Sequence, residues 1–384
     1  MWGAIWGESW SERRGVAFVS AAEVLPLEDR ARFLEDWRAL FHKAEKPTFF
    51  QSPAWMAAWL NGRPAGVRLY RVEAKKDGAL CLLGVVGARM ARRPALIGAR
   101  EARLHEFAVP NLDAVYIEYN DFLIDRGAGE VRRAALEALL CGVDEADAVV
   151  FRNATPALTQ AVKAAAATHG LDVRTLNEQH AYVCDLDALR RTQKGFIETL
   201  SPSAQSKIRR SVRLYEERGA LEGRIAQTPD ERARAWAALL DLHAQGWRRR
   251  GRSGVFADPA FTGFHDRLRG AAPDACHLFE AAVGGKTIGV LYNFSHDGCV
   301  MNYQSGFRFE DDNRLVPGFV CHALAAQHYL EAGYNAYDLL AGDAGYKRRL
   351  AAPSTALTSL AVERPNWRRA VRRFVKRSVP LRRA

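Results

Sequence analysis

The chain has 384 residues, of which 48% are hydrophobic and 26% charged, a balance typical of a globular protein with room for two domains. It contains no run of eighteen or more apolar residues, which excludes an apolar membrane-spanning helix and predicts a cytoplasmic protein. Its six cysteines show neither a Cys-x-x-Cys pair nor zinc-site spacing, so we expect reduced cysteines and no metal.

The net charge of +11 is concentrated partly in residues 364–384, where basic residues surround a short apolar stripe at helical spacing. The stripe consists of Trp367, Val371, Phe374 and Val375. Two interpretations of this basic amphipathic tail remain open. It is either a helix at the inner membrane surface, where each basic residue contributes about 1 kcal/mol on anionic lipid, or a terminal helix that docks on the body.

The first half of the chain predicts helices, then a hairpin, a strand, a helix and further strands. The expected helices are 27–43, one that starts at Pro53 after a capping Ser52, 130–141 and 156–169. The expected strands are 67–74, 79–90, 119–124, 148–152, 171–176 and 181–187. Asp77-Gly78 supplies the positive φ that a tight hairpin turn needs.

The second half repeats this order roughly two hundred residues later. Residues 276–283, 287–295 and 299–304 predict a meander, followed by a helix over 317–332 that ends at Gly333 and a strand over 336–340. Between the halves, Ser201-Pro202 and the capping box that starts at Thr228 predict a basic helical insert.

Four segments together resemble a known family: 203–213, 243–251, the strand–helix run 303–329 and the ending Tyr337–Gly342 with Tyr346-Lys347. They are similar to the CelD/BcsL type of acetyltransferase, within the GNAT superfamily and related to the FemAB aminoacyl ligases. The resemblance covers roughly residues 20 to 365. It implies acyl-CoA as the donor, no metal cofactor, and a role in bacterial cell-envelope or exopolysaccharide chemistry.

The resemblance also implies an α+β fold with two tandem GNAT-like lobes, built from mixed, mostly antiparallel sheets flanked by helices. We expect an N-terminal lobe at 1–185, a helical insert at 186–273, an acyl-donor-binding lobe at 274–363 and the basic tail at 364–384. One departure is visible, because the Gln/Arg-x-x-Gly-x-Gly/Ala phosphate loop of simple GNAT enzymes is replaced by Asn313–Gly318. FemAB relatives accept an aminoacyl-tRNA donor, so that donor stays open.

The donor site is expected at the start of the 317–332 helix, whose free N–H groups and dipole suit a pyrophosphate. Arg314 precedes this helix by one turn, although it can equally be a solvated arginine. The residues assigned to the donor are Asn302, Gln304, Arg314, Val316, Pro317 and Gly318. The strand before the helix would offer backbone groups to the acyl arm.

Direct acyl transfer needs a base and a group that polarises the thioester carbonyl. Asp338, at the C-terminal end of a strand, is a candidate base or acceptor clamp, or else a structural partner of an arginine. Lys347 can neutralise a phosphate or carboxylate, or simply lie in water, and Tyr346 can act as an acid. His243 is the fourth catalytic candidate, although a histidine on an apolar face is more often a core residue.

The acceptor is assigned to Trp247, Tyr303, Lys207 and Arg210. Trp247 shares a helix stripe with His243 and suits stacking on a sugar ring, whereas basic runs such as the one around Lys207 and Arg210 usually solvate a helix face. We therefore carry three hypotheses: an acyl-CoA-dependent N- or O-acyltransferase for an envelope saccharide or amine, an aminoacyl-tRNA-dependent ligase, and a non-catalytic adaptor for anionic polymer or membrane. Only the ligase would bring a specific nucleic acid as partner.

Overall fold

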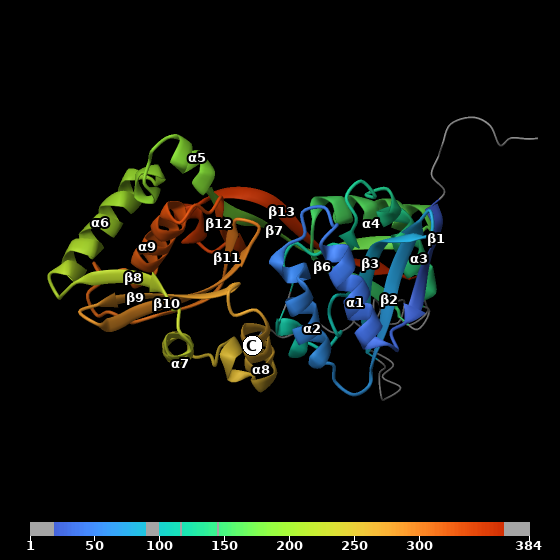
Figure 1. Cartoon of the computed structure of the whole chain (residues 1–384), viewed down its shortest axis with the longest axis horizontal. Coiled ribbons are helices and arrows are strands. Elements are labelled where there is room, and N and C mark those ends of the chain that lie inside the picture. The colour runs from blue at the N-terminus through green and yellow to red at the C-terminus, as the bar shows by residue number, and fades with distance from the viewer. Residues whose placement is uncertain (1–18, 90–99, 116, 144–145, 365–384) are drawn as a thin grey trace, which may run out of the picture.

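The computed structural model describes residues 19–89, 100–115, 117–143 and 146–364. In this part of the chain, two lobes lie side by side, each with helices packed against its part of a β-sheet (Figure 1). The α+β class with a mixed sheet flanked by helices, expected from the sequence, is confirmed. Met90, predicted as a strand end, and the tail from 365 to 384 lie outside the described residues.

The N-terminal lobe contains the elements up to α4. Its strands are β1 (Val19–Pro26), β2 (Val67–Lys76), β3 (Ala79–Arg89), β4 (Glu101–Leu104), β5 (Leu123–Ile124) and β6 (Ala148–Ala154). Its helices are α1 (Arg30–Phe41), α2 (Pro53–Asn61), α3 (Val131–Gly142) and α4 (Pro156–Thr168), with short 3₁₀ helices η1 (Phe49–Gln51) and η2 (Leu112–Ala114). Ser52 caps α2 as expected, because its side chain accepts from the Trp55 N–H.

The C-terminal lobe contains the remaining described elements. Its strands are β7 (Asp172–Asp185), β8 (Leu221–Ile225), β9 (Cys276–Val283), β10 (Lys286–His296), β11 (Cys299–Phe307), β12 (Ala336–Ala341) and β13 (Ala352–Glu363). Its helices are α5 (Leu186–Arg191), α6 (Pro202–Glu216), α7 (Pro229–Arg248), α8 (Pro259–Ala271), α9 (Pro317–Glu331) and α10 (Lys347–Leu350), with η3 (Phe196–Thr199) and η4 (Val255–Ala257). Ser201 and the Thr228 capping box start α6 and α7 as predicted.

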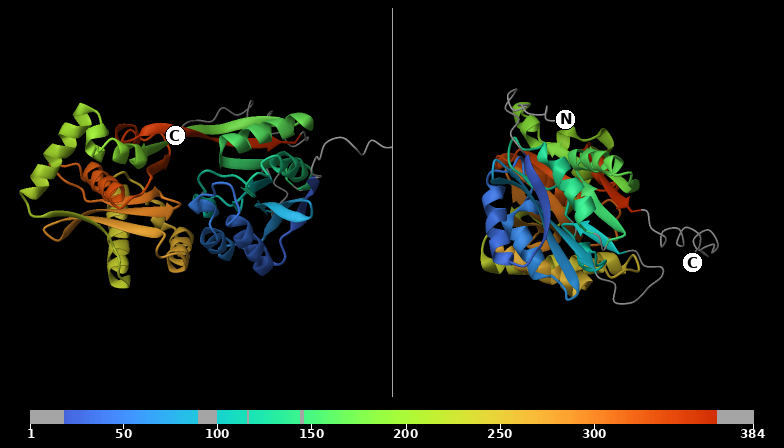
Figure 2. Two further views of the ribbon diagram at one scale, coloured as in Figure 1. Left: turned by 45° about the horizontal axis from the view of Figure 1, so that its top comes forward. Right: turned by 90° about the vertical axis from the view of Figure 1, so that its right-hand side faces the viewer.

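One hydrogen-bonded sheet of thirteen strands runs through the described part of both lobes. Its order is β1-β2-β3-β4-β6-β13-β7-β12-β11-β10-β9-β8, with β5 paired to β3. The long strands β7 and β13 pair with each other between the lobes (Figure 2). β13 also pairs with β6 of the N-terminal lobe, and β7 with β12 of the C-terminal lobe, so the last strand of the chain closes the first lobe.

Both lobes contain the same unit, a parallel strand pair joined by a connection that includes a helix. β4 pairs in parallel with β6 across α3, and β11 with β12 across α9. The second strand of each pair has a β-bulge where it pairs with its other neighbour, β6 with β13 and β12 with β7. Each bulge contains a residue with positive φ, Asn153 (47°) in β6 and Leu340 (61°) in β12. The internal repeat read from the sequence is therefore present.

Three expectations about individual elements are corrected. The strand predicted over 119–124 is mostly a loop in which Tyr119 has positive φ, and the strand that follows the β2–β3 hairpin is the short, charged β4. The two strands predicted within 171–187 are one, because residues 177–180 stay extended by pairing with β13. The segment 186–273, expected to be helical, also contributes edge strand β8.

Aromatic side chains from both lobes form a shared core. Phe49 stacks on Phe294 of β10 with ring centroids 4.5 Å apart, and Trp55 lies edge-on to Phe264 at 4.8 Å and to Tyr303 at 6.0 Å. Packing of this density fixes the orientation of the two lobes. No helix in the described ranges is both long and apolar enough to cross a bilayer.

Leu360 on β13 tests whether the C-terminal strand holds the N-terminal lobe together. Its side chain is fully buried in that lobe's core. We expect Leu360→Ala to lower the free energy of unfolding by about 2–5 kcal/mol, because it removes buried methyl groups and leaves a cavity. Urea denaturation measures the change.

The control is Leu176→Ala on β7, whose side chain is 41% exposed. This variant should change the free energy of unfolding by less than about 1 kcal/mol, since surface positions contribute little. Equal losses in the two variants would contradict a role for β13 in the N-terminal core.

Candidate functional site

β11 and β12 separate after three paired residues and leave an opening between them. Cys299–Met301 pair in parallel with Ala336–Asp338, after which β11 continues to Phe307 and β12 to Ala341 with no further ladder pairs between them. Backbone groups of β11 that face β12 beyond Met301 are therefore left without a ladder partner. Such groups can bind an extended ligand as a neighbouring strand would.

Both strands carry a β-bulge at the opening. Tyr303 is the extra residue of β11, because Gln304 pairs with Tyr292 and Asn302 with Asn293 of β10. In β12 the register with β7 shifts between Asp338 and Ala341, where Leu340 has positive φ. A bulge redirects the local backbone and side chains, and bulges are common beside active sites.

A cavity of about 160 Å³ occupies this opening. Its wall is formed by β11 residues 302–305, β12 residues 339–341, Tyr346, Lys347 and Glu118. The structure thus brings together five residues predicted from the sequence, Asn302, Tyr303, Gln304, Tyr346 and Lys347. It adds Glu118, which comes from the N-terminal lobe and was not predicted.

Asp338, predicted as a base, lies just behind this wall with both carboxylate oxygens engaged. Its Oδ2 accepts from the Tyr119 hydroxyl at 2.6 Å, and its Oδ1 from the Leu340 N–H at 2.7 Å. Burial raises the pKa of Asp338 to about 6, although these hydrogen bonds and Lys347 oppose the shift. Its position makes Asp338 an anchor for the loop that carries Glu118.

Glu118 is the buried carboxylate that faces the cavity. Its side chain is almost fully buried, and its Oε2 has no hydrogen-bond partner within the described residues. Burial raises the pKa of Glu118 above its ordinary value, and the charge of Lys347 opposes the rise. A buried carboxylate that lines a cavity, has a raised pKa and keeps one oxygen unpaired has the properties of a general base.

Lys347 and Tyr346 close the cavity from the chain segment after β12. The Lys347 ammonium donates to the carbonyls of Leu340 at 3.2 Å and Ala341 at 2.7 Å, and burial lowers its pKa. Burial raises the pKa of the Tyr346 hydroxyl to about 12, so it keeps its proton at neutral pH. The Tyr346 ring stacks on His322 of α9 at 5.5 Å.

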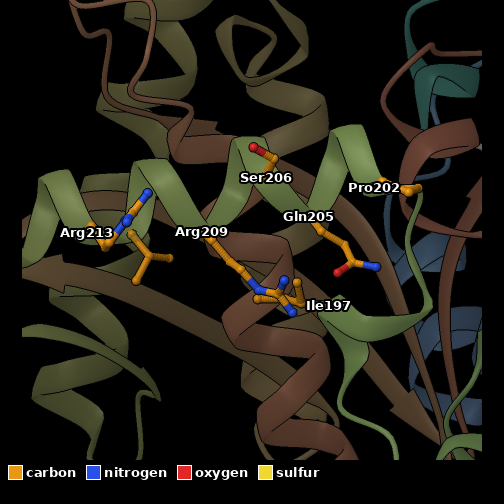
Figure 3. Close-up of a pocket in the computed structure, with 7 residues that line it drawn as sticks. Ile197, Pro202, Gln205, Ser206, Arg209 and Arg213 are labelled. Atoms are coloured by element: carbon orange, nitrogen blue, oxygen red, sulfur yellow. The ribbon is translucent and has the colours of Figure 1, made fainter.

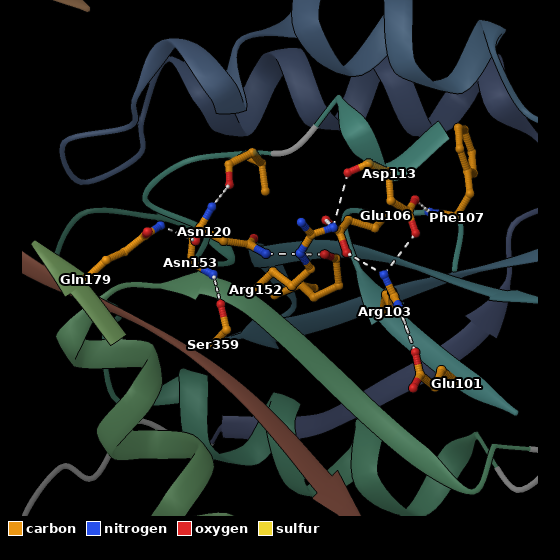
Figure 4. A network of polar contacts seen from close by, with 12 residues as sticks. Glu101, Arg103, Glu106, Phe107, Asp113, Asn120, Arg152, Asn153, Gln179 and Ser359 are labelled. Carbon is orange, nitrogen blue, oxygen red and sulfur yellow. Dashed lines mark hydrogen bonds and ion pairs between the residues drawn. The ribbon is translucent and has the colours of Figure 1, made fainter. Parts of the chain in front are cut away.

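In the N-terminal lobe the equivalent opening, between β4 and β6, is filled by the protein's own chain (Figure 4). The Asn120 N–H donates to the Asn153 carbonyl at 2.9 Å, and the Asn120 carbonyl accepts from the Thr155 N–H at 3.1 Å. The Asn120 side chain also donates to the Leu104 carbonyl at 3.2 Å and contacts His105 Nδ1 at 2.8 Å. These bonds fix the segment 117–121, which carries Glu118 and Tyr119.

A buried ionic cluster lies beside this filled opening (Figure 4). Glu106 lies 2.9 Å from the Arg152 guanidinium and 3.5 Å from that of Arg103, which also contacts Asp113 at 3.2 Å. Both Glu106 oxygens nevertheless lack a well-directed hydrogen bond, and complete burial raises the pKa of Glu106 to about 8. These ion pairs make the cluster a support for the loop.

The start of α9, where the sequence predicts the donor site, has the following surroundings. Among the described residues, this helix has no side-chain N-cap hydrogen bond. The Val316 N–H donates instead to Ser211 Oγ of α6 at 3.0 Å. Lys207 of α6 lies 5.4 Å from the ring of Phe319 in the first turn of α9. Arg314 is exposed and pairs with Asp312 at 2.8 Å, so its charge is partly neutralised. Pro317 and Gly318 begin the helix as predicted.

His243 and Trp247 do not line the cavity. Trp247 Nε1 donates to His243 Nε2 at 2.8 Å, and the His243 ring packs on Phe256 at 4.7 Å. Burial lowers the pKa of His243 to about 4, which keeps it neutral in this aromatic cluster. The structure thus places His243 in the core, the alternative that sequence reasoning preferred for such a residue.

The basic face of α6 is divided between two flanks. Lys207 lies toward α9, and Arg210 is exposed. On the other flank, Arg209 and Gln205 point toward Ile197 of η3 in an open depression of about 620 Å³ (Figure 3). Lys207, Arg210 and Trp247 do not line the cavity that contains Tyr303, the remaining residue assigned to the acceptor. Within the described ranges, no cluster of three or more metal-binding side chains occurs.

Comparison with protein-family models places an acetyltransferase (GNAT) domain at residues 202–348, from α6 to α10. A comparison with curated proteins finds no match. Among solved structures, FemX is similar over 89% of this chain and 98% of its own, with a TM-score of 0.58 and 10% identity. These values show a shared fold.

Two further structures share the fold. The C-terminal domain (DUF2156) of a putative lysylphosphatidylglycerol synthetase from Agrobacterium fabrum has a TM-score of 0.51 and 13% identity, over 91% of this chain and 97% of that one. L-PGS from Bacillus licheniformis has the same two values, over 92% and 98%. Because an acetyltransferase (GNAT) domain matches within this fold, the protein is an acyltransferase. The hypothesis of a non-catalytic adaptor is therefore set aside.

The pH dependence of stability tests the burial of Asp338. Its pKa is about 6 when folded against an ordinary value of 3.8, so the folded state holds the proton more tightly. The resulting stabilisation is complete below about pH 4 and is lost as the pH rises through 6. We expect the free energy of unfolding to fall between pH 4 and 7 by on the order of 2 kcal/mol more in the wild type than in Asp338→Asn.

Denaturant unfolding at several pH values measures this difference. Asp311→Asn, which changes an exposed loop carboxylate, is the matched control and should follow the wild type. Parallel pH curves for the wild type and Asp338→Asn would show that the Asp338 carboxyl does not hold its proton in the folded protein.

Proposed function

We propose that the protein is an acyl-CoA-dependent N- or O-acyltransferase that transfers an acyl group, most simply acetyl, directly to a saccharide or amine. The observation that carries this proposal is the buried Glu118 carboxylate, which lines the cavity between β11 and β12 and whose Oε2 has no hydrogen-bond partner among the described residues. The GNAT domain match at 202–348 includes both strands of that opening. A base that faces an opening suited to an extended acyl arm supports direct transfer.

The reaction requires that one proton is removed from the acceptor and that one proton is delivered to the departing thiolate. Glu118 takes a proton from the acceptor amine or hydroxyl, whose lone pair forms the new bond to the thioester carbonyl carbon. The unpaired backbone N–H groups of β11 beyond Met301 polarise the carbonyl oxygen. The carbon–sulfur bond then breaks, and the Tyr346 hydroxyl supplies a proton to the departing thiolate. Glu118 then releases its proton to water and Tyr346 takes a proton back from water, so both groups return to their starting states.

The donor's phosphates are assigned to the first turn of α9. Its N–H groups and helix dipole attract an anion, and Lys207 and Arg314 flank the turn. Asn302 and Gln304 line the cavity on β11. Asn302 is held in place because its Nδ2 donates to the buried Asn293 Oδ1 at 2.8 Å. The acyl arm would therefore lie along β11 with its reactive end near Glu118.

An aminoacyl-tRNA-dependent ligase is the second candidate. The loop before α9 carries Glu310, Asp311 and Asp312, and Asp312 already pairs with Arg314, which is unfavourable for a compact pyrophosphate. The fold similarity to FemX and to two proteins titled as lysylphosphatidylglycerol synthetase or L-PGS agrees with this alternative. The CelD/BcsL type and a role in bacterial envelope or exopolysaccharide synthesis stay proposals that depend on the sequence resemblance.

Glu118→Gln tests the assigned base. The substitution keeps the size of the side chain and removes its ability to accept a proton, so kcat should fall by about a hundredfold or more while the donor dissociation constant stays unchanged. Because the wild-type base must be ionised, kcat/KM should rise with pH, and the variant should lose this limb. Steady-state kinetics across pH and donor titration measure both quantities.

Glu106→Gln is the matched control, because Glu106 is also a buried carboxylate with a raised pKa but does not line the cavity. It should retain the shape of the wild-type pH profile. A Glu118→Gln enzyme with normal kcat would remove Glu118 from the chemistry.

Thermal unfolding with saturating acetyl-CoA, a longer acyl-CoA and free CoA tests the donor class. A ligand at a hundred times its dissociation constant stabilises the folded state by about 2.7 kcal/mol, which raises the thermal midpoint. Arg314→Ala should weaken this effect, and Arg234→Ala, at an exposed position of α7, should not. If no CoA species shifts the midpoint but activity requires charged tRNA, the ligase replaces the acyl-CoA enzyme.

A further inference from the structure

A second cavity, of about 230 Å³, lies where the two lobes meet at α2 and α8. These helices are neighbours in Figure 1, one from each lobe. The cavity is separate from the one that contains Glu118, since the two share no lining residue. The function proposed above does not use it.

The lining of this second cavity is apolar. Trp59, Phe107, Val115 and Phe264 contribute to it, and each of these side chains is at most 5% exposed. Trp59 and Phe107 stack with their ring centroids 4.2 Å apart and an interplanar angle of 9°. An apolar cavity of roughly 150 Å³ is large enough to bind benzene, so this one has room for a longer hydrocarbon group.

One cationic side chain lines the same cavity. Arg267 of α8 is exposed and forms no ion pair with any described residue. Its Nε makes one long contact of 3.4 Å with the Ala58 carbonyl. A Cβ at Gly62 would lie 3.2 Å from Arg267 Nη2, so glycine at this position leaves room for the guanidinium.

The carboxylates closest in sequence to the lining residues are already engaged. Glu106 forms ion pairs with Arg103 and Arg152, and Asp113 binds Arg103 and the Phe107 N–H. Asp258 caps α8, and Asp266 pairs with Arg269. Arg267 therefore has spare hydrogen-bond donors beside an apolar cavity. A guanidinium binds a carboxylate through two parallel hydrogen bonds, which makes a carboxylate its natural ligand.

We propose that this cavity binds a small apolar carboxylate, with its hydrocarbon chain of about eight carbons against Trp59, Phe107 and Phe264 and its carboxylate on Arg267. Each methylene buried there strengthens binding by about fourfold, and the ion pair selects the anion over a neutral molecule of the same length. The ligand would contact both lobes. It is bound and not transformed at this position.

Isothermal titration of the full chain with octanoate, and with octan-1-ol as the neutral probe, tests the proposal. Octanoate should bind the wild type, and Arg267→Gln should weaken its binding by about tenfold or more through loss of the ion pair. Octanol should bind the wild type and this variant equally. Arg234→Gln on α7, again at an exposed position, is the matched control and should bind octanoate as the wild type does.

Ala260→Phe supplies an independent test, because Ala260 lines the cavity and is only partly buried, so a larger side chain can fill the space. This variant should lose both probes while its thermal midpoint without ligand stays that of the wild type. Absence of octanoate binding to the wild type, or octanoate affinity that neither variant changes, would overturn the proposal. Both outcomes are independent of acyl-CoA and of Glu118.

Discussion

The hydrogen bond from the Tyr119 hydroxyl to Asp338, 2.6 Å long, is the contact on which the candidate site depends. It joins a loop of the N-terminal lobe to a strand of the C-terminal lobe. Because Glu118 directly precedes Tyr119, this bond determines where the Glu118 carboxylate lies relative to β11 and β12. A shift of about 1 Å in a catalytic group can reduce a rate a hundredfold, so the packing of the two lobes becomes part of the chemistry.

The two repeated units have different tasks. In the C-terminal lobe the opening between the parallel strands stays free and forms a cavity. In the N-terminal lobe Asn120 fills the corresponding opening through hydrogen bonds to Asn153, Thr155 and Leu104. The segment that closes the first opening is the one that supplies Glu118 to the second. One repeat therefore acts as the support that completes the candidate site of the other.

The sequence predicted the elements from β9 to β12 well because their signals are local. Hairpin glycines, the Pro317 helix start and the strand before Lys347 all fall where β9 to β12 and α9 form. Glu118 could not be found this way, since its partners Lys347 and Asp338 lie more than two hundred residues away and no local pattern marks it. Strand β13 was missed for the same reason, because pairing with β6 and β7 stabilises a segment rich in serine, threonine and alanine.

Backbone strain accompanies the buried charge at the cavity. Tyr119 and Leu340 have positive φ, a conformation that costs non-glycine residues on the order of 1 kcal/mol or more. Burial of Glu118, Asp338 and Lys347 adds a desolvation cost at the cavity. The surrounding sheet and aromatic core must offset both costs. In return, the buried Glu118 carboxylate binds a proton more tightly than an exposed glutamate in water does. Costs of this kind around one small cavity are typical of functional sites.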